Sequence, residues 1–305
     1  MKLYTPTYYP AFRCIASKCK HSCCVGWEID IDAQAFARYR EMKGALGDRL
    51  RQEIEAGDPP HFRLTEGDRC PFLDRDGLCE IILSCGEGAL CQICADHPRY
   101  RNVYSDRVEM GLGLSCEAVS DLLLSWQDPV AWVAVDGTDT PTEEENAFFA
   151  LRGELVSLLQ DRTRPLLNRL SEVAKRLDLP TDTPTASFLR MYLPLESMSE
   201  EWRVAIDRAI KADGEGSALL ADPQYAIPFE QLAVYFIDRY LRDALTDDAY
   251  DARVAFALLS VWVIAAITPY LPTLQEAARL YSAEIEYSDQ NVSTLLDVID
   301  EHLWA

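Results

Sequence analysis

The residues of this sequence that could do chemistry are its ten cysteines, all of which lie between Cys14 and Cys116. Thiolates spaced two to four residues apart can turn several sulfurs toward one point, as zinc sites and iron–sulfur clusters both require. The spacing Cys14-x4-Cys19-x3-Cys23-Cys24, followed by Cys91-x-x-Cys94, therefore predicts a metal centre. The predicted ligands are Cys14, Cys19, Cys23, Cys24, Cys70, Cys79, Cys91 and Cys94.

The adjacent pair Cys23-Cys24 bears on which metal is bound. Ordinary structural zinc sites use two evenly spaced pairs of ligands. Two neighbouring side chains tend to point apart, so they can serve different centres or different roles. The pair therefore favours a cluster or a site with two centres. Because the spacing also departs from the ferredoxin patterns, both a 4Fe–4S cluster and zinc remain open.

Other uses of the thiols are less favoured by the sequence. The first residues lack the basic start and apolar stretch of a secretory signal, so we expect a cytoplasmic protein with reduced thiols rather than disulfides. A redox protein built on Cys91-x-x-Cys94 would need an exposed thiol of low pKa. We interpret His21 and His97 as structural because cysteines are ample nearby. Cys85 is expected to be a buried or free thiol.

A glycine-rich segment, Glu109-x-Gly111-x-Gly113-x-Ser115, approximates the cofactor-binding turn of Rossmann-like methyltransferases. The third glycine of that turn is missing, and no regular βαβ pattern surrounds the segment. We therefore interpret it as part of a small hairpin formed by residues 100–104 and 107–112.

The elements that must position the cysteines divide the chain into two predicted domains. Residues 1–126 are expected to form a cysteine-rich metal-binding module, with irregular structure in residues 1–30 and one helix from Asp32 to about Glu55. Residues 142–305 are expected to form an acidic, all-helical region. The predicted fold is mainly α, with the metal module and its hairpin packed against the helical region.

Helix signals are strong in the second predicted domain. Thr142-x-x-Glu145 and Thr273-x-x-Glu276 both have the capping-box arrangement that begins a helix. The apolar run Val254 to Ile267 is shorter than the roughly 18 to 20 residues that span a bilayer, so we expect a buried helix and no membrane partner.

The formal net charge of −21 limits the partners that the protein can bind. Most of the acidic excess lies in residues 126–305. Nucleic acid is disfavoured as a partner because its binding depends on Lys and Arg neutralising phosphates. A negative field would attract a lysine-bearing partner, although an acidic surface also serves solubility alone.

Several of these motifs resemble a known family. The block Cys14/Cys19/Cys23-Cys24, with Cys70-Pro-Phe-Leu, Gly77-Leu-Cys79-Glu-Ile and Cys94-x-x-His-Pro, resembles the CxxCxxCC family of zinc- or iron-chelating proteins. Three further segments are similar to its flagellin lysine N-methylase (FliB-like) branch: Tyr4-Thr-Pro-x-Tyr8, the run from Cys91 to Tyr100, and the run Gly111-Leu-Gly-Leu-Ser-Cys116-Glu-Ala. These motifs cover the first 120 residues or so, and the helical remainder offers no diagnostic residue.

The resemblance implies a methyltransferase that uses S-adenosylmethionine and a 4Fe–4S cluster to modify lysine side chains of flagellin. It names no catalytic residue and no residue that binds the methyl donor. Cys91 and Cys116 match only the narrower branch. The competing hypothesis is a non-catalytic, zinc-stabilised adaptor or assembly protein that binds a basic partner. Brown protein with labile sulfide would favour the enzyme, and colourless zinc protein would favour the adaptor.

Overall fold

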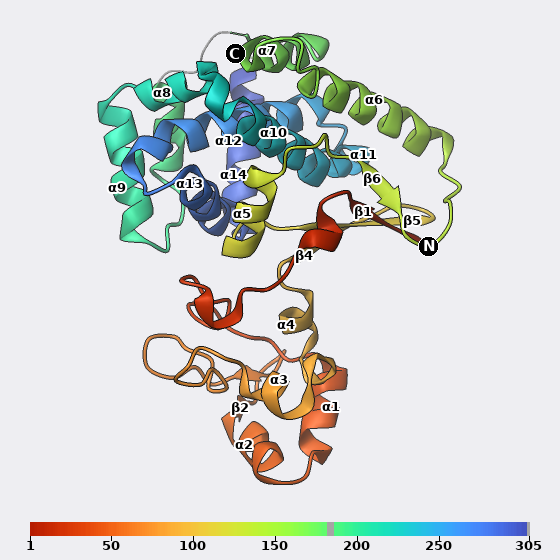
Figure 1. Cartoon of the computed structure of the whole chain (residues 1–305), viewed down its shortest axis with the longest axis vertical. Helices are drawn as coiled ribbons and strands as arrows, with labels where there is room; N and C mark the ends of the chain where they lie inside the picture. Colours follow the sequence, from red (N-terminus) through yellow and green to blue (C-terminus); the bar gives the residue numbers. More distant parts are fainter. Residues whose placement is uncertain (182–185, 304–305) are drawn as a thin grey trace. The chain divides into compact units, whose positions relative to one another are not determined.

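The computed structural model describes residues 1–181 and 186–303, and most of them are helical. Figure 1 shows the chain, which divides into two compact units. The helical unit comprises Met1–Phe12, Arg101–Ser115 and Val119–Ala305. The cysteine unit comprises Arg13–Tyr100 and Cys116–Ala118. The domains predicted from sequence are continuous ranges, whereas each unit is assembled from more than one segment.

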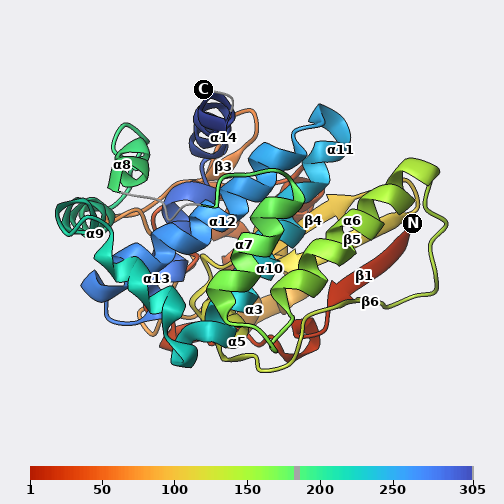
Figure 2. The ribbon, with the colours of Figure 1, turned by 90° about the horizontal axis from the view of Figure 1, so that it is seen from above.

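The helical unit is built around α12 (Tyr250–Ile267), which packs against α10 (Ala226–Tyr240), α13 (Leu274–Tyr281) and α14 (Asp289–Leu303) (Figure 2). The segment Tyr250–Tyr270 is long and apolar enough to cross a membrane, but 83% of its apolar window is buried inside the fold. Such burial is typical of a core helix, and it confirms the predicted buried helix.

Helix starts in this unit follow the capping signals in the sequence. The Thr142 hydroxyl accepts a hydrogen bond from the Glu145 N–H at 3.2 Å, and the Glu145 carboxylate accepts one from the Thr142 N–H at 2.9 Å. This capping box begins α6 (Glu143–Leu159). The Thr273 hydroxyl caps α13 by accepting a hydrogen bond from the Glu276 N–H at 3.1 Å. The other helices are α5 (Glu117–Ser125), α7 (Leu166–Arg176), α8 (Ala186–Leu189), α9 (Glu200–Lys211) and α11 (Ala244–Asp247).

A four-stranded sheet with the order β4-β5-β1-β6 completes the helical unit. The predicted hairpin is present as β4 and β5, and its turn is closed by Tyr104 N–H, which donates to Arg107 C=O at 2.8 Å. The expectation of irregular structure at the chain start is wrong for residues 2–6, because β1 pairs parallel with β5 and antiparallel with β6. The strands are β1 (Lys2–Pro6), β4 (Arg99–Val103), β5 (Arg107–Leu112) and β6 (Trp132–Ala134).

The cysteine unit contains only short elements. The single helix predicted for residues 32–55 is wrong, because α1 (Ala33–Glu41) and α2 (Ala45–Glu53) are separate helices. Gly44 between them has a φ of +86°, and a Cβ atom on Gly47 would lie 2.1 Å from the Met42 carbonyl oxygen. The turn therefore requires glycine at both positions. The other elements are β2 (Ile54–Glu55), β3 (His61–Phe62), α3 (Glu80–Cys85) and α4 (Gln92–Asp96).

The core of the cysteine unit is small and aromatic. Phe62 contacts Tyr39 and Phe72, with ring centroids 6.1 and 5.1 Å apart. Cys70 and Cys91 are buried in the same cluster of side chains. Residues 9–28, by contrast, contain no buried residue. Ordinary packing therefore fixes one part of this unit and leaves the Cys14–Cys24 segment without a core of its own.

Candidate metal centre

A cavity of about 80 Å³ in the cysteine unit brings together most of the predicted ligands. Electrostatic interactions link its thiols: Cys70 interacts with Cys24, Cys79 and Cys91, and Cys94 interacts with Cys24, Cys70 and Cys91. We call Cys24, Cys70, Cys79, Cys91 and Cys94 the inner set. The cysteines lining the cavity are these five and Cys23.

Short local structures place the inner thiols around the cavity. Cys70 N–H donates to Cys24 C=O at 2.8 Å, which holds these two residues side by side. The Asp74 carboxylate accepts from the N–H groups of Asp76 and Leu78, and the resulting turn leads back to Cys79 at the start of α3. These contacts bring thiols distant in sequence to one wall.

Asp32 positions the last two inner thiols. One of its carboxylate oxygens accepts from Ala35 N–H at 2.9 Å and so caps α1, while the other accepts from Gln92 N–H at 2.7 Å. Gln92 is the first residue of α4, whose cap is Cys91 and whose first turn contains Cys94. A single carboxylate thus fixes the start of two helices and with them the Cys91-x-x-Cys94 pair.

Burial controls the protonation of the inner thiols. It raises the pKa of Cys70 to about 12 and also raises the pKa of Cys79. A hydrogen bond from the Cys94 thiol lowers the pKa of Cys91, while the same bond and burial raise the pKa of Cys94. Most of these thiols are therefore protonated at neutral pH, and a bound metal would have to displace their protons.

Aromatic and aliphatic side chains form the rest of the cavity wall. Trp27 Nε1 donates to Cys23 C=O at 2.6 Å, and Tyr39 OH donates to Ala89 C=O at 2.8 Å. The His97 ring lies 6.3 Å from the Trp27 ring, and burial lowers the pKa of His97 to about 4, so its imidazole is neutral. The cavity therefore offers sulfur ligands within an apolar, poorly hydrated surrounding.

The thiols of the inner set line a volume. Among residues 1–181 and 186–303, no three His, Cys, Asp or Glu side chains are gathered closely enough to hold one metal ion. A zinc ion needs its sulfur ligands at about 2.3 Å from a common point. An iron–sulfur cluster instead takes thiolates at separate irons, so its ligands surround a volume. Thiols around an apolar cavity meet that second requirement.

Four of the five remaining cysteines form a second group, in which none of the residues is fully buried. Cys23 interacts electrostatically with Cys14 and Cys116, and Cys19 interacts with Cys116. We call Cys14, Cys19, Cys23 and Cys116 the outer set. The Cys23 thiol donates to Cys24 and, by that bond, lowers the pKa of Cys24 to about 7, so the vicinal pair joins the two sets.

The structure also shows residues that sequence reasoning missed. Cys116 was left out of the predicted ligands, yet it lies in the cysteine unit with the outer set. Trp27 and Tyr39 line the cavity, and only the position of Trp27 three residues after Cys24 could have pointed to it. Cys85 is exposed at the end of α3, as expected for a free thiol.

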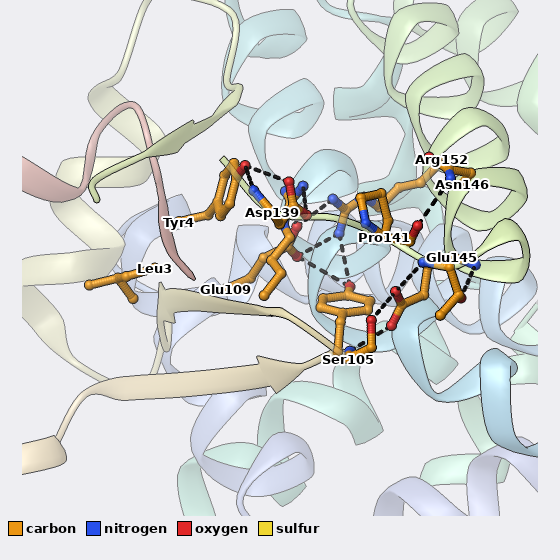
Figure 3. A network of polar contacts seen from close by, with 12 residues as sticks. Leu3, Tyr4, Ser105, Glu109, Asp139, Pro141, Glu145, Asn146 and Arg152 are labelled. Atoms are coloured by element: carbon orange, nitrogen blue, oxygen red, sulfur yellow. Dashed lines mark hydrogen bonds and ion pairs between the residues drawn. The ribbon is translucent and has the colours of Figure 1, made fainter. Parts of the chain in front are cut away.

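The helical unit contains a second polar cluster, in which charged side chains pair with one another (Figure 3). Arg152 donates from Nη1 and Nη2 to the two carboxylate oxygens of Glu109, each at 2.6 Å, and Arg107 also pairs with Glu109. The Glu109 side chain is fully buried. This network ties β5 to α6, and it confirms that the glycine-rich segment begins as a strand rather than as a cofactor turn.

Nearby, burial raises the pKa of Asp238 to about 6, although Arg152 Nε lies 3.7 Å from its carboxylate. Desolvation therefore outweighs the attraction of the neighbouring cation at this position.

Three curated relatives match this chain. The flagellar biosynthetic protein FliU of Salmonella muenchen is 29% identical over 133 residues, which cover 41% of this chain and 79% of FliU. The lysine-N-methylases of Salmonella typhimurium and Salmonella choleraesuis are each 29% identical over 133 residues. The matched segment spans about a third of each methylase, 33% of its length. No family model matches the chain. No solved structure matches it either. Over the matched segment, these relatives confirm the predicted resemblance to the flagellin lysine N-methylase family.

Proposed function

We propose that this protein is a protein-lysine methyltransferase whose active centre includes the thiol-lined cavity. The observation that carries the proposal is that five thiols of the inner set face one apolar cavity in a chain related to lysine-N-methylases. The relatives support the reaction class, and the cavity supports an inorganic cofactor.

The proposed cofactor is a 4Fe–4S cluster, and the inner set would hold it. When bound, such a cluster supplies an iron with an open coordination position, which can bind the amino and carboxylate groups of S-adenosylmethionine. The inner set has five thiols, more than the three that such a cluster needs if one iron stays open. The thiols that do not ligate would then serve as hydrogen-bond partners within the set.

The chain's own groups would contribute alignment and the exclusion of water. A methyl group can move only to a neutral lysine amine, so the substrate lysine must lose its proton. The apolar wall around Trp27 and Tyr39 would disfavour the charged ammonium by desolvation and so lower the pKa of the incoming lysine. The site would also hold the methyl donor and the lysine amine in line, which raises the rate of methyl transfer above that of the same reaction in solution.

The proposed substrate is flagellin. One relative is named a flagellar biosynthetic protein, and two are named lysine-N-methylases. The net charge of −21 favours approach of a surface that presents lysines. We place the reaction in the cytoplasm, where the thiols of both sets would stay reduced.

The test is mass spectrometry of flagellin co-expressed with the full chain. Wild-type protein and the variant Cys85→Ser should both add methyl groups to flagellin lysines, because Cys85 lies outside both sets. The variant Cys70→Ser should add none. Flagellin that stays unmodified beside wild-type protein with a full complement of iron would refute the proposal.

A second candidate is a non-catalytic, zinc-stabilised adaptor that binds a basic partner. FliU, which matches over 79% of its length, has a name that states no activity. The two candidates differ in colour and in sulfide content. Anaerobically purified protein that is colourless, contains zinc and lacks labile sulfide would favour the adaptor.

A further inference from the structure

We propose that the free edge of strand β6 binds an extended segment of the protein substrate, one in which lysines alternate with apolar residues. The inference deepens the proposed function and rests on it in one respect, because it takes the partner to be the protein that is methylated. It concerns recognition by the helical unit alone.

The pairing of β6 with β1 leaves one side of β6 open. Val135 N–H donates to Leu3 C=O at 2.8 Å, and the two strands are antiparallel. In such a pair the bonds alternate along each strand, so the main-chain groups of Trp132 and Ala134 point away from β1. β6 ends the sheet order, and no strand of the described residues pairs with this second side.

The side chains of β6 do not protect this open side. Natural edge strands are usually protected from further pairing by charged residues, proline or a covering segment. β6 has the sequence Trp-Val-Ala, and the neighbouring Val133 and Val135 side chains are 50% and 60% exposed. Hydrogen bonds to β1 continue through Ala131 and Val135, so the extended stretch is longer than β6 itself. Another chain can therefore reach this side.

The opposite edge of the same sheet, strand β4, is protected. Tyr104 N–H donates to Arg107 C=O, so by the same alternation the Val103 C=O points away from β5. Arg242 covers this carbonyl by donating from Nε and Nη2 at 3.0 and 2.7 Å. β4 also carries two arginines, whereas β6 carries no charge. One edge of the sheet is thus capped and charged, and the other is open and apolar.

The charges around β6 indicate which partner fits. Between residues 108 and 151 the sequence contains no Lys, Arg or His, and the exposed Asp128 and Asp136 flank β6. Glu143 and Glu144 are exposed at the start of α6, the next helix in the chain. A second copy of this chain would bring two acidic edges together, whereas a lysine-bearing segment would bring opposite charges together.

Strand addition accounts for both features of the proposed partner. Main-chain hydrogen bonds to Trp132 and Ala134 would supply affinity, and alternate side chains of the added strand would supply specificity. Apolar side chains on one face of the added strand would contact Val133 and Val135. The lysines between them would be attracted by the surrounding carboxylates.

The test is fluorescence anisotropy of a labelled peptide in which valine alternates with lysine, titrated with the full-length protein. This peptide should bind, and the same peptide with glutamate in place of lysine should not. A third peptide keeps the lysines but is N-methylated on all its backbone amides, so it has the charge without the hydrogen-bond donors. It should lose binding, because the affinity of an added strand depends on main-chain hydrogen bonds.

Two lysine substitutions locate the binding edge. Val133→Lys places a positive charge beside β6 and should weaken binding of the valine–lysine peptide by about tenfold, because like charges oppose each other. The matched control is Val103→Lys on β4, where the wild-type side chain is 45% exposed, and it should bind as the wild type does. Flagellin methylation by Val133→Lys should show a higher KM and an unchanged kcat.

Equal binding of the N-methylated peptide, wild-type binding by Val133→Lys, or an equal loss in both lysine variants would each overturn the inference. A dimer that dissociates in Val133→Lys, measured by sedimentation velocity, would also overturn it, since a second copy would then occupy the edge. Peptide binding as expected, beside flagellin that is never methylated, would support the edge as a binding site and defeat only the proposed function.

Discussion

Buried polar groups have different kinds of partner in the helical unit and in the cysteine unit. In the helical unit, Glu109 pairs with Arg107 and Arg152, and the buried Glu230 pairs with Arg162 and Arg169, so each buried charge has partners from the chain itself. In the cysteine unit, the inner thiols have chiefly one another. A buried charge without a partner costs several kcal/mol, and the paired carboxylates of the helical unit avoid that cost. Most inner thiols avoid it by staying protonated, so a metal that binds there would have to displace their protons.

From this difference we expect the helical unit to determine mainly stability and the cysteine unit to determine mainly function. Changes in the helical unit should act on the free energy of unfolding. Changes in the cysteine unit should act first on what the protein binds. The following predictions test that separation, beginning with the largest effect.

Replacing an inner thiol should abolish the cofactor while leaving the helical unit folded. In Cys24→Ser, we expect most of the iron to be lost and flagellin methylation to fall by about 10-fold or more, because even outer-shell changes at metal sites cost about 10–100-fold. Iron analysis and methylation mass spectrometry measure these two losses. Retention of wild-type iron and activity would remove Cys24 from the ligand set.

Breaking the buried ion pair should destabilise the helical unit strongly. In Arg152→Met, Glu109 loses its bidentate partner, and we expect the free energy of unfolding to fall by about 3–5 kcal/mol. The matched control is Arg176→Met, which removes an exposed partner of Glu154 and should leave the free energy of unfolding nearly unchanged. Urea unfolding followed by circular dichroism measures both. Equal effects would contradict the contrast between buried and exposed pairs.

The buried Asp238 should make stability fall as the pH rises. Its pKa is raised from 3.8 to about 6 in the folded protein, so between these values the unfolded chain releases the proton while the folded chain keeps it. The stabilising contribution is therefore complete below about pH 4 and is lost as the pH rises through about 6.

The variant Asp238→Asn should lack this dependence. Relative to it, the wild type should lose up to about 3 kcal/mol between pH 4 and pH 7. Chemical denaturation at both pH values measures the difference. A difference between the two proteins that is independent of pH would show that Asp238 keeps an ordinary pKa in the folded state.

Removing the helix cap at Thr142 should have the smallest effect. In Thr142→Ala, the first turn of α6 loses the acceptor for Glu145 N–H, and we expect a loss of about 1 kcal/mol of stability. Thr142→Ser keeps the acceptor and should lose less. Iron content should stay at the wild-type value in both variants. A loss of iron would contradict the separation of stability in the helical unit from cofactor binding in the cysteine unit.

Local signals in the sequence predicted much of the helical unit. The capping box at Thr142 and the apolar run from Val254 to Ile267 depend on residues within one or a few helical turns, so they could be recognised without knowledge of distant contacts. The helix predicted across Gly44 failed because a glycine turn outweighed the helical periodicity on either side. The strand β1 was missed because its partners β5 and β6 lie about 100 residues or more away in the sequence.

The sequence by itself determined that this protein carries many clustered thiols, because the number and spacing of its cysteines can be read from it directly. Only the tertiary structure decided how those thiols are grouped. Cys23 and Cys24 are adjacent in the chain, yet Cys24 interacts with the inner set and Cys23 interacts with Cys14 and Cys116. Cys116 also interacts with Cys19, which lies nearly a hundred positions earlier in the sequence. The physical reason is that grouping depends on long-range hydrogen bonds, such as those from Cys70 to Cys24 and from Lys20 to Glu117, which no local pattern encodes.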